Sequence, residues 1–226
     1  MKHQDLRRLG DRAFVIEFGD SIDEGINLRV HACAHELERL RLPGVLSVVP
    51  TFNAVTIHYD PLRLARSGAQ RPSETMRHAL QEMLLGLRDE IDAPGRDVEI
   101  PARFGGADGP DMAEVAAHAG LTAQGVVELY CAQSYKVYMM GFAPGFAYLG
   151  GLPTRLHVPR RGTPRLKVPA GSVAIGGAQT GVYPMDLPGG WNLIGRTGAR
   201  LFDLAADPPC LLQPGDRVRF IPEPAE

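Results

Sequence analysis

The stretch from Tyr135 to Thr197 is dense in glycine and proline, and it constrains the fold more than any other part of the chain. It contains the segments YKVYMMGFAPGFAYLGGLP and PRRGTPRLKVPAGSVAIGGAQTGVYPMDLPGGWNLIGRT. Helices do not tolerate this density, because glycine is too flexible and proline lacks the N–H donor. Short strands joined by shaped turns are therefore predicted, with polar and aromatic side chains presented on the turns. Such a surface is typical of a binding site.

Composition favours a soluble globular protein of one large domain or two small ones. The chain has 226 residues, of which 44% are hydrophobic and 22% charged, and a net charge of −2, which argues against a nucleic-acid or anionic-membrane protein. No apolar run is long enough to span a membrane, and Met1–Phe14 lacks the apolar core of a signal peptide. Cys33, Cys131 and Cys210 are far apart and odd in number, so neither a disulfide framework nor a CxxC metal site is indicated. A cytoplasmic location is expected.

The first third of the chain alternates strands and helices. A first helix is predicted to begin at a capping box formed by Ser21 and Glu24, and a second near Pro72. Strands are predicted at Ala13–Phe18, Val45–Val49, Ala54–Tyr59 and Arg96–Ile100. The resulting order, β-α-β-β-α-β, predicts a ferredoxin-like α/β sandwich. A boundary near Asp92–Gly95 gives domains at 1–95 and 96–226, and the strand that follows it, Arg96–Ile100, could belong to either domain.

Helical spacing predicts which side chains of these two helices face a core. The stripe of the first helix is Ile26, Val30, Cys33, Leu37 and Leu40. That of the second is Met76, Leu80, Met83, Leu84 and Leu87.

The second domain is predicted to begin with two short helices, Asp111–His118 and Ala123–Cys131. Beyond Tyr135 apolar pairs recur between turns, which predicts a barrel or a sandwich of strands. The fold class is therefore α+β.

Three patterns that resemble known sites are better explained structurally. His31 and His35 have metal-chelating spacing, but both are predicted to point away from the core stripe into solvent. The second short helix, expected to start at Thr122, holds no Arg or Lys up to Cys131, which argues against a DNA-binding helix-turn-helix. The glycine-rich segment Gly176–Gly181 lacks the Lys-Ser/Thr pair of a phosphate loop, because Val182 follows it. No metal site is predicted.

A cationic cluster is the strongest candidate for ligand binding. Arg160, Arg165 and Lys167 lie with Arg161 within eight residues, and prolines between them stiffen the loop. A guanidinium offers a planar fork to carboxylate or phosphate. A solvated charged loop is the alternative, and the sequence leaves both open. Further candidates for the same surface are Arg196, Asp186, Gln179, Tyr183, Trp191 and Asn192.

Aromatic side chains form a second candidate surface, in the loop GFAPGFAYL. Phe142, Phe146 and Tyr148 are predicted either to bury in a core or to face a partner, and the lone Trp191 has the same two possibilities. No Ser-His-Asp, Cys-His or GxSxG arrangement occurs, so catalytic residues are unknown and the chain does not look like a complete enzyme.

Several ordered motifs in these segments resemble one family, the B-type subunits of 5-oxoprolinase, also called allophanate hydrolase subunit 1 or the sporulation-kinase inhibitor family. They are GFxPGFxYL from Gly141, PR from Pro159 with TPR from Thr163, VPAGSV from Val168, QTGxYP from Gln179, PGGWxLIGRT from Pro188 and LxPGDxVxF from Leu212. The resemblance covers nearly the whole chain and is looser in the N-terminal third.

The resemblance implies a small N-terminal α/β domain followed by a cyclophilin-like β-barrel domain. It also implies a component that is inactive alone and that works with A-type and C-type (allophanate hydrolase subunit 2-type) subunits in the ATP-dependent opening of 5-oxoproline to glutamate. ATP with Mg²⁺ would be needed by the complex. Tyr130 departs from the family pattern, in which a His often stands at this position.

Together, the residues and the resemblance predict a substrate site made by Arg160, Arg165, Lys167, Gln179, Tyr183 and Arg196. A partner interface is expected at Phe142, Phe146, Tyr148 and Trp191. Two alternatives remain open at this point. One is a histidine-kinase inhibitor, which needs a protein-binding face and no substrate pocket; the other is a component of a urea- or allophanate-processing complex.

Overall fold

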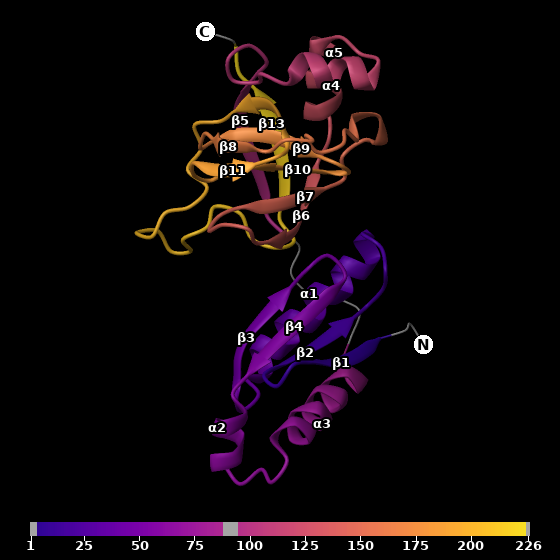
Figure 1. Ribbon diagram of the computed structural model, residues 1–226, viewed down its shortest axis with the longest axis vertical. Helices are drawn as coiled ribbons and strands as arrows, with labels where there is room; N and C mark the ends of the chain where they lie inside the picture. The colour runs from indigo at the N-terminus through magenta and orange to yellow at the C-terminus, as the bar shows by residue number, and fades with distance from the viewer. Residues whose placement is uncertain (1–3, 88–94, 225–226) are drawn as a thin grey trace. The chain divides into compact units, whose positions relative to one another are not determined.

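The chain divides into two compact units, Met1–Ala93 and Pro94–Glu226. The computed structural model describes residues 4–87 and 95–224, and each unit is described by itself below (Figure 1). The predicted boundary, Asp92–Gly95, lies outside the described residues except for Gly95.

The N-terminal unit is a four-stranded antiparallel sheet whose core face is covered by α1 and α3. Its elements are β1 (Asp5–Leu9), β2 (Ala13–Glu17), α1 (Glu24–Leu40), β3 (Val45–Pro50), β4 (Ala54–Tyr59), α2 (Pro61–Arg66) and α3 (Pro72–Leu85). The strand order is β1-β2-β4-β3. Strands β2 and β4 alternate in burial, and their inward side chains Phe14, Ile16 and Ile57 meet Leu37 and Leu80 of the helices.

The predicted β-α-β-β-α-β order is wrong in its last element. The edge of the sheet next to β2 is occupied by β1, in which Leu6 lies opposite Ile16. The strand expected there from Arg96–Ile100 is β5 (Asp97–Phe104) and belongs to the other unit, where it pairs with β13 (Arg217–Pro222). The sequence pattern does not predict β1, because a mostly exposed edge strand carries no strong apolar alternation.

Local details of α1 and α2 also differ from the sequence predictions. The N-cap of α1 is Asp23, whose carboxylate accepts a hydrogen bond from the N–H of Ile26 at 3.0 Å, so the predicted Ser21–Glu24 capping box is wrong. An acidic cap also complements the positive end of the helix. α2 was not predicted, although Asp60 followed by Pro61 is a typical helix start, and the Asp60 side chain accepts from Leu62.

The core stripes are mostly as predicted, with exceptions at the end of α1. Val30, Cys33 and Leu37 are buried, whereas Leu40 is 40% exposed. His35 is exposed as expected, but the prediction for His31 is wrong because only 9% of this residue is accessible.

The C-terminal unit is a closed seven-stranded barrel, which confirms the predicted all-β character of the chain beyond Tyr135. Around the barrel the order is β10-β7-β6-β13-β5-β12-β9, and β5 and β13 run parallel. The barrel strands not yet bounded are β6 (Tyr135–Met140), β7 (Ala147–Gly150), β9 (Ser172–Gly176), β10 (Gln179–Val182) and β12 (Asn192–Arg196). A 3₁₀ turn, η1 (Thr154–Leu156), follows β7.

Outside the barrel, β8 (Arg165–Val168) and β11 (Leu187–Gly189) form a two-stranded ribbon. Through Val168 the ribbon packs on an apolar cluster of its own, separate from the barrel core, whose other buried members are Phe146, Ala174, Tyr183, Trp191 and Leu193. This cluster is where the glycine- and proline-rich segments converge.

The two predicted short helices are present as α4 (Met112–Ala119) and α5 (Ala123–Cys131), and they contact β12 and β13. Thr122 caps α5 as expected by accepting from the N–H of Gly125 at 3.0 Å. Asp111 is the N-cap residue of α4, but its carboxylate makes no capping bond and is used elsewhere.

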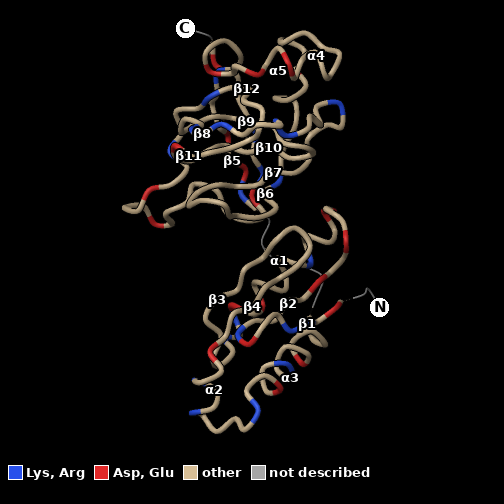
Figure 2. The backbone as a smooth tube through the Cα atoms, in the orientation of Figure 1, with Lys and Arg blue, Asp and Glu red and all other residues tan. Residues whose placement is uncertain are grey.

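Basic and acidic residues are interspersed along both units (Figure 2). Among the described residues, no helix combines the length and the apolar character needed to cross a membrane.

Candidate functional site

The aromatic loop and the PGGW segment meet in one tightly packed cluster of rings. Phe146 lies edge-on to Tyr183 and to Trp191, with ring centroids 5.4 and 5.6 Å apart, and Tyr148 lies 5.8 Å from Trp191. Such edge-to-face pairs stabilise beyond their buried area. Phe146, Tyr183 and Trp191 are almost completely buried, so these rings form a rigid wall.

A pocket of about 310 Å³ opens against this wall. It is lined by Phe142, Phe146, Tyr148, Arg160, Arg161, Pro164, Tyr183, Pro188, Gly189, Gly190 and Trp191. Mostly apolar walls with a few polar groups are typical of small-molecule sites. The pocket therefore brings together two residues of the predicted substrate site, Arg160 and Tyr183, with all four residues of the predicted partner interface.

Arg160 is the exposed cation of the pocket. Its guanidinium lies over the ring of Trp191, 5.8 Å from the centroid, which is within cation–π range. Among the described residues it makes no ion pair with a carboxylate, so its donors are available to an anionic ligand.

Arg161 and Arg165 are held by one buried carboxylate, that of Asp111. Arg161 and Arg165 donate to Asp111 Oδ1 at 2.8 and 2.7 Å. The other oxygen, Oδ2, accepts from the N–H of Leu193 at 2.7 Å. Asp111 is 4% exposed, so it is a buried anchor that neutralises two neighbouring cations and fixes the loop that carries them.

The remaining predicted substrate residues do not line the pocket. Lys167 pairs with Asp186 at 2.8 Å, and Arg196 donates to the carbonyl of Ala170 at 3.1 Å. Gln179 is buried, and its Nε2 has no hydrogen-bond partner among the residues that the structure describes. Arg165 is bonded to Asp111 and does not line the pocket either.

Phe142 is an exposed residue of the pocket lining. Its φ of 71° lies in the left-handed region, which is strained for a residue with a side chain. The ring is 59% exposed and packs edge-on to Phe146 at 5.4 Å. An exposed aromatic ring held in a strained backbone is a candidate contact for a partner.

The two pocket tyrosines are neutral hydrogen-bonding groups. Burial raises the pKa of Tyr183, and a hydrogen bond with the main chain of Trp191 offsets part of this rise. Burial also raises the pKa of Tyr148, against the smaller opposing effect of Arg160. Both hydroxyls therefore stay protonated at neutral pH. The hydroxyl of Tyr183 lies against Gly189, where any side chain would collide with it.

Tyr130, the departure from the family pattern, lies inside the barrel rather than in the pocket. It is fully buried between Tyr135 and Phe220, each with its ring centroid 5.0 Å away. Its hydroxyl lies 2.7 Å from Thr180 Oγ1, and Thr180 Oγ1 donates its own proton to the carbonyl of Ala174 at 2.8 Å. Tyr130 is thus the donor in a buried hydrogen bond.

The sequence missed the role of Asp111, which had been interpreted only as a helix start. Its partners, Arg161, Arg165 and Leu193, lie between 50 and 82 residues later in the chain. No local pattern marks a carboxylate that is used at such a distance. Within the described residues, no group of three or more His, Cys, Asp or Glu could hold a metal ion.

Residues 4–212 match the family model described as "Carboxyltransferase domain, subdomain C and D". The chain is 42% identical to the B subunit of 5-oxoprolinase from Bacillus subtilis, with 96% of this chain and 91% of that protein covered. It is 45% identical to the B subunit of 5-oxoprolinase from Escherichia coli O157:H7, with 95% and 94% covered. The chain belongs to the 5-oxoprolinase B-subunit family.

Solved structures agree with the family's fold. The crystal structure of TTHA0988 matches with a TM-score of 0.82 and 40% identity, covering 95% of this chain but only 40% of that one. The urea amidolyase of K. lactis matches with a TM-score of 0.77 and 21% identity over 97% of this chain and 15% of the enzyme, which shows a shared fold alone. A chain of the 5-oxoprolinase B-subunit family thus also has the architecture of one part of larger proteins.

Proposed function

We propose that this chain is the B-type subunit of an ATP-dependent 5-oxoprolinase that opens 5-oxo-L-proline to L-glutamate. The observation that carries the proposal is identity of 42% and 45% over nearly the full chain with two proteins named as the B subunit of 5-oxoprolinase. In this proposal the chain is inactive alone and works in the cytoplasm with A-type and C-type subunits. Its barrel is of the cyclophilin-like type that the family resemblance implies.

The pocket beside Trp191 is the proposed substrate site. The lactam ring packs against the aromatic wall, and Arg160 receives the substrate carboxylate. Tyr183 and Tyr148, both neutral, supply hydrogen bonds to the amide. Arg165 acts indirectly by fixing Asp111 and with it the loop of Arg160. The proposal gives Lys167, Gln179 and Arg196 supporting positions outside the pocket.

The proposed reaction activates the lactam before water attacks it. The γ-phosphoryl group of ATP moves to the lactam oxygen, and water then adds to the same carbon. The C–N bond breaks and its nitrogen takes a proton, which leaves an acyl phosphate. A second water then displaces the phosphate, so one ATP and two waters are consumed and the products are glutamate, ADP and phosphate. This chain's residues hold the ring and its carboxylate in place, a contribution that lowers the barrier by orientation.

The proton transfers are assigned to a partner protein of the complex. The pocket lining holds two arginines and two neutral tyrosines as its polar side chains, and no carboxylate or histidine. Asp111, which contacts the lining residue Arg161, is held by Arg161, Arg165 and the main chain. We therefore place the general base on a partner that closes over the pocket. Mg²⁺ enters this scheme only as the companion of ATP in the complex.

Glutamate formation from 5-oxoproline and ATP tests the proposal, using the three co-purified subunits with and without this chain. Activity that requires the chain is expected; absence of activity in a verified complex would reject the function. Trp191 is the only tryptophan, so its fluorescence also reports binding of 5-oxoproline to this chain directly, with Arg160→Ala as the control. No observation in the described part of the chain favours the kinase-inhibitor or urea-type alternatives.

A further inference from the structure

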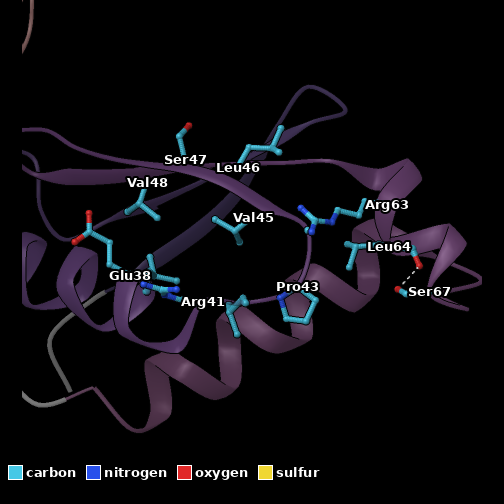
Figure 3. A pocket seen from close by; sticks show the side chains of 13 residues that line it. Glu38, Arg41, Pro43, Val45, Leu46, Ser47, Val48, Arg63, Leu64 and Ser67 are labelled. Atoms are coloured by element: carbon cyan, nitrogen blue, oxygen red, sulfur yellow. Dashed lines mark hydrogen bonds between the residues drawn. The ribbon is translucent and has the colours of Figure 1, made fainter.

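The N-terminal unit has a larger cavity than the proposed substrate pocket, and the function proposed above does not use it. This groove, of about 540 Å³, runs along β3 between the end of α1 and α2 (Figure 3). It is lined by Leu37, Glu38, Arg41, Leu42, Pro43, Gly44, Val45, Leu46, Ser47, Val48, Arg63, Leu64 and Ser67. We name it the β3 groove.

The walls of the β3 groove are fixed by local packing. Gly44, with a φ of +83°, lets Leu64 of α2 approach so closely that a Cβ on Gly44 would lie 2.9 Å from the Leu64 Cγ. The N–H of Asp60 donates to the carbonyl of Gly44 at 2.8 Å, and Ser67 Oγ donates to the carbonyl of Leu64 at 2.8 Å. The groove is therefore formed before any ligand arrives, which lowers the entropic cost of binding.

One wall of the groove is an open sheet edge. β3 is the last strand of the sheet, with β4 as its one neighbour, so its outer edge pairs with no strand among the described residues. A register shift between Val45 and Ser47 and the proline at Pro50 limit the free edge to its central residues. An exposed edge of this kind accepts a short extended segment as an added strand.

Apolar side chains are exposed on β3 and on α2. Leu46 is 62% exposed, Val49 41% and Leu62 57%. Leu46 lines the groove, and Val49 and Leu62 directly adjoin lining residues in the sequence. A small ligand inside the groove would leave most of this surface in water, whereas a protein segment along the edge would cover it.

Charge at the groove indicates the chemistry of the segment. Arg41 and Arg63 line opposite walls, and neither makes an ion pair within the described residues. Arg41 also occupies the left-handed position that ends α1, with a φ of 46°, where glycine is the residue that fits without strain. Two unpaired arginines against one glutamate, Glu38, favour an acidic occupant.

We propose that the β3 groove binds an extended segment of a partner protein, in which an acidic residue stands two positions from an aliphatic one. The segment adds as a strand to β3, its aliphatic side chain fills the space beside Leu37 and Leu42, and its carboxylate pairs with Arg41 and Arg63. Residues two apart face the same side of a strand, which sets this spacing. A second copy of this chain fits less well, because β3 (VLSVVP) brings no acid to the arginines.

Binding of a labelled, blocked peptide of about seven residues, Ser-Val-Thr-Leu-Thr-Asp-Ser, to the full chain tests the proposal. Fluorescence anisotropy is expected to detect binding, and the same peptide with asparagine in place of aspartate is expected to bind about tenfold more weakly. The double variant Arg41→Gly, Arg63→Gln is likewise expected to bind the aspartate peptide about tenfold more weakly than the wild type does. It should fold well, since glycine suits the left-handed position.

The matched control is Arg66→Gln, which removes an exposed arginine of α2 that does not line the groove. Amide hydrogen exchange at Ser47 to Val49 is expected to slow when the peptide binds. Equal affinity of the aspartate and asparagine peptides, or of wild type and the double variant, would overturn the proposal. Binding of glutarate instead of the peptide would also overturn it. Self-association through β3, detected by sedimentation and not prevented by the peptide, would overturn it too.

Discussion

Arg165 donates a hydrogen bond of 2.7 Å to the carboxylate of Asp111, which lies 54 residues earlier in the chain. The same oxygen accepts from Arg161, and the other oxygen accepts from the N–H of Leu193. Asp111 thus joins the start of α4, the cationic loop and β12. Two cations that would repel each other are held together, and the third, Arg160, is left facing the pocket.

Removing the charge of Asp111 is expected to destabilise the barrel. Asp111→Asn leaves Arg161 and Arg165 without their counter-charge, and because both guanidiniums are partly exposed we expect a loss of about 2 kcal/mol in the free energy of unfolding. Urea denaturation measures this. Glu114→Gln is the control, since the exposed Glu114 touches Arg161 only at 3.3 Å and should change stability by less than about 0.5 kcal/mol. Equal effects of the two changes would contradict the anchor role.

Arg160 and Arg165 are expected to differ in what they control. Arg160→Ala should raise the KM for 5-oxoproline about tenfold or more and lower the free energy of unfolding by only about 0.5 kcal/mol, because this exposed side chain makes a cation–π contact with Trp191 but no ion pair among the described residues. Arg165→Ala should lower the free energy of unfolding by about 1 kcal/mol. Steady-state kinetics of the complex and urea unfolding of the chain separate the two effects. A larger stability loss in Arg160→Ala than in Arg165→Ala would reverse these roles.

Phe142→Gly is expected to weaken assembly without weakening the fold. Glycine relieves the strain of a φ of 71° and removes a ring that is 59% exposed. The melting temperature should therefore stay level or rise, while affinity for the C-type partner falls about tenfold. Thermal unfolding and titration calorimetry measure the two quantities. Unchanged affinity would remove Phe142 from the partner interface.

The fold is expected to lose stability at alkaline pH through two thiols, that of the buried Cys33 and that of the partly buried Cys131. Burial raises the pKa of Cys33 to about 12 and that of Cys131 to about 11, from 9.0. Above pH 9 the unfolded chain releases these protons while the folded chain keeps them, so stability is full below pH 9 and falls as pH rises toward the folded values.

Cys131→Ala should therefore flatten the decline in unfolding free energy between about pH 9 and about pH 11. Urea titrations at a series of pH values measure the slope. Cys210→Ala, which removes a partly exposed thiol of the same unit, is the control. An unchanged slope in Cys131→Ala would show that this thiol does not contribute.

Tyr130 is expected to act in packing. Tyr130→Phe keeps the ring and loses the hydrogen bond to Thr180, which should cost about 1 kcal/mol in unfolding free energy and leave the activity of the complex unchanged. Tyr130→His should cost more, since the smaller polar ring would not fill the space between Tyr135 and Phe220. A Tyr130→His variant with the same free energy of unfolding as the wild type would contradict this packing role.

Elements with local signals can be predicted from the amino-acid sequence. Periodicity and start signals place α1, α3, α4 and α5 within a few residues of their observed bounds, although the predicted capping box of α1 is wrong. Glycine and proline correctly indicate a strand-rich second half. The family motifs are local signals too, because they are recognised from the order of residues along the chain and do not depend on tertiary contacts.

Which residues come into contact depends on the long-range packing of the chain. β5 could complete either unit, and long-range pairing with β13 assigns it to the barrel. Likewise, Arg160 and Arg165 look alike in the cationic loop, but Arg165 is bonded to the distant Asp111 whereas Arg160 lines the pocket. Periodicity and capping act over a few residues, whereas pairing and burial depend on segments brought together from across the chain, so the sequence shows the parts of the pocket and the fold decides their roles.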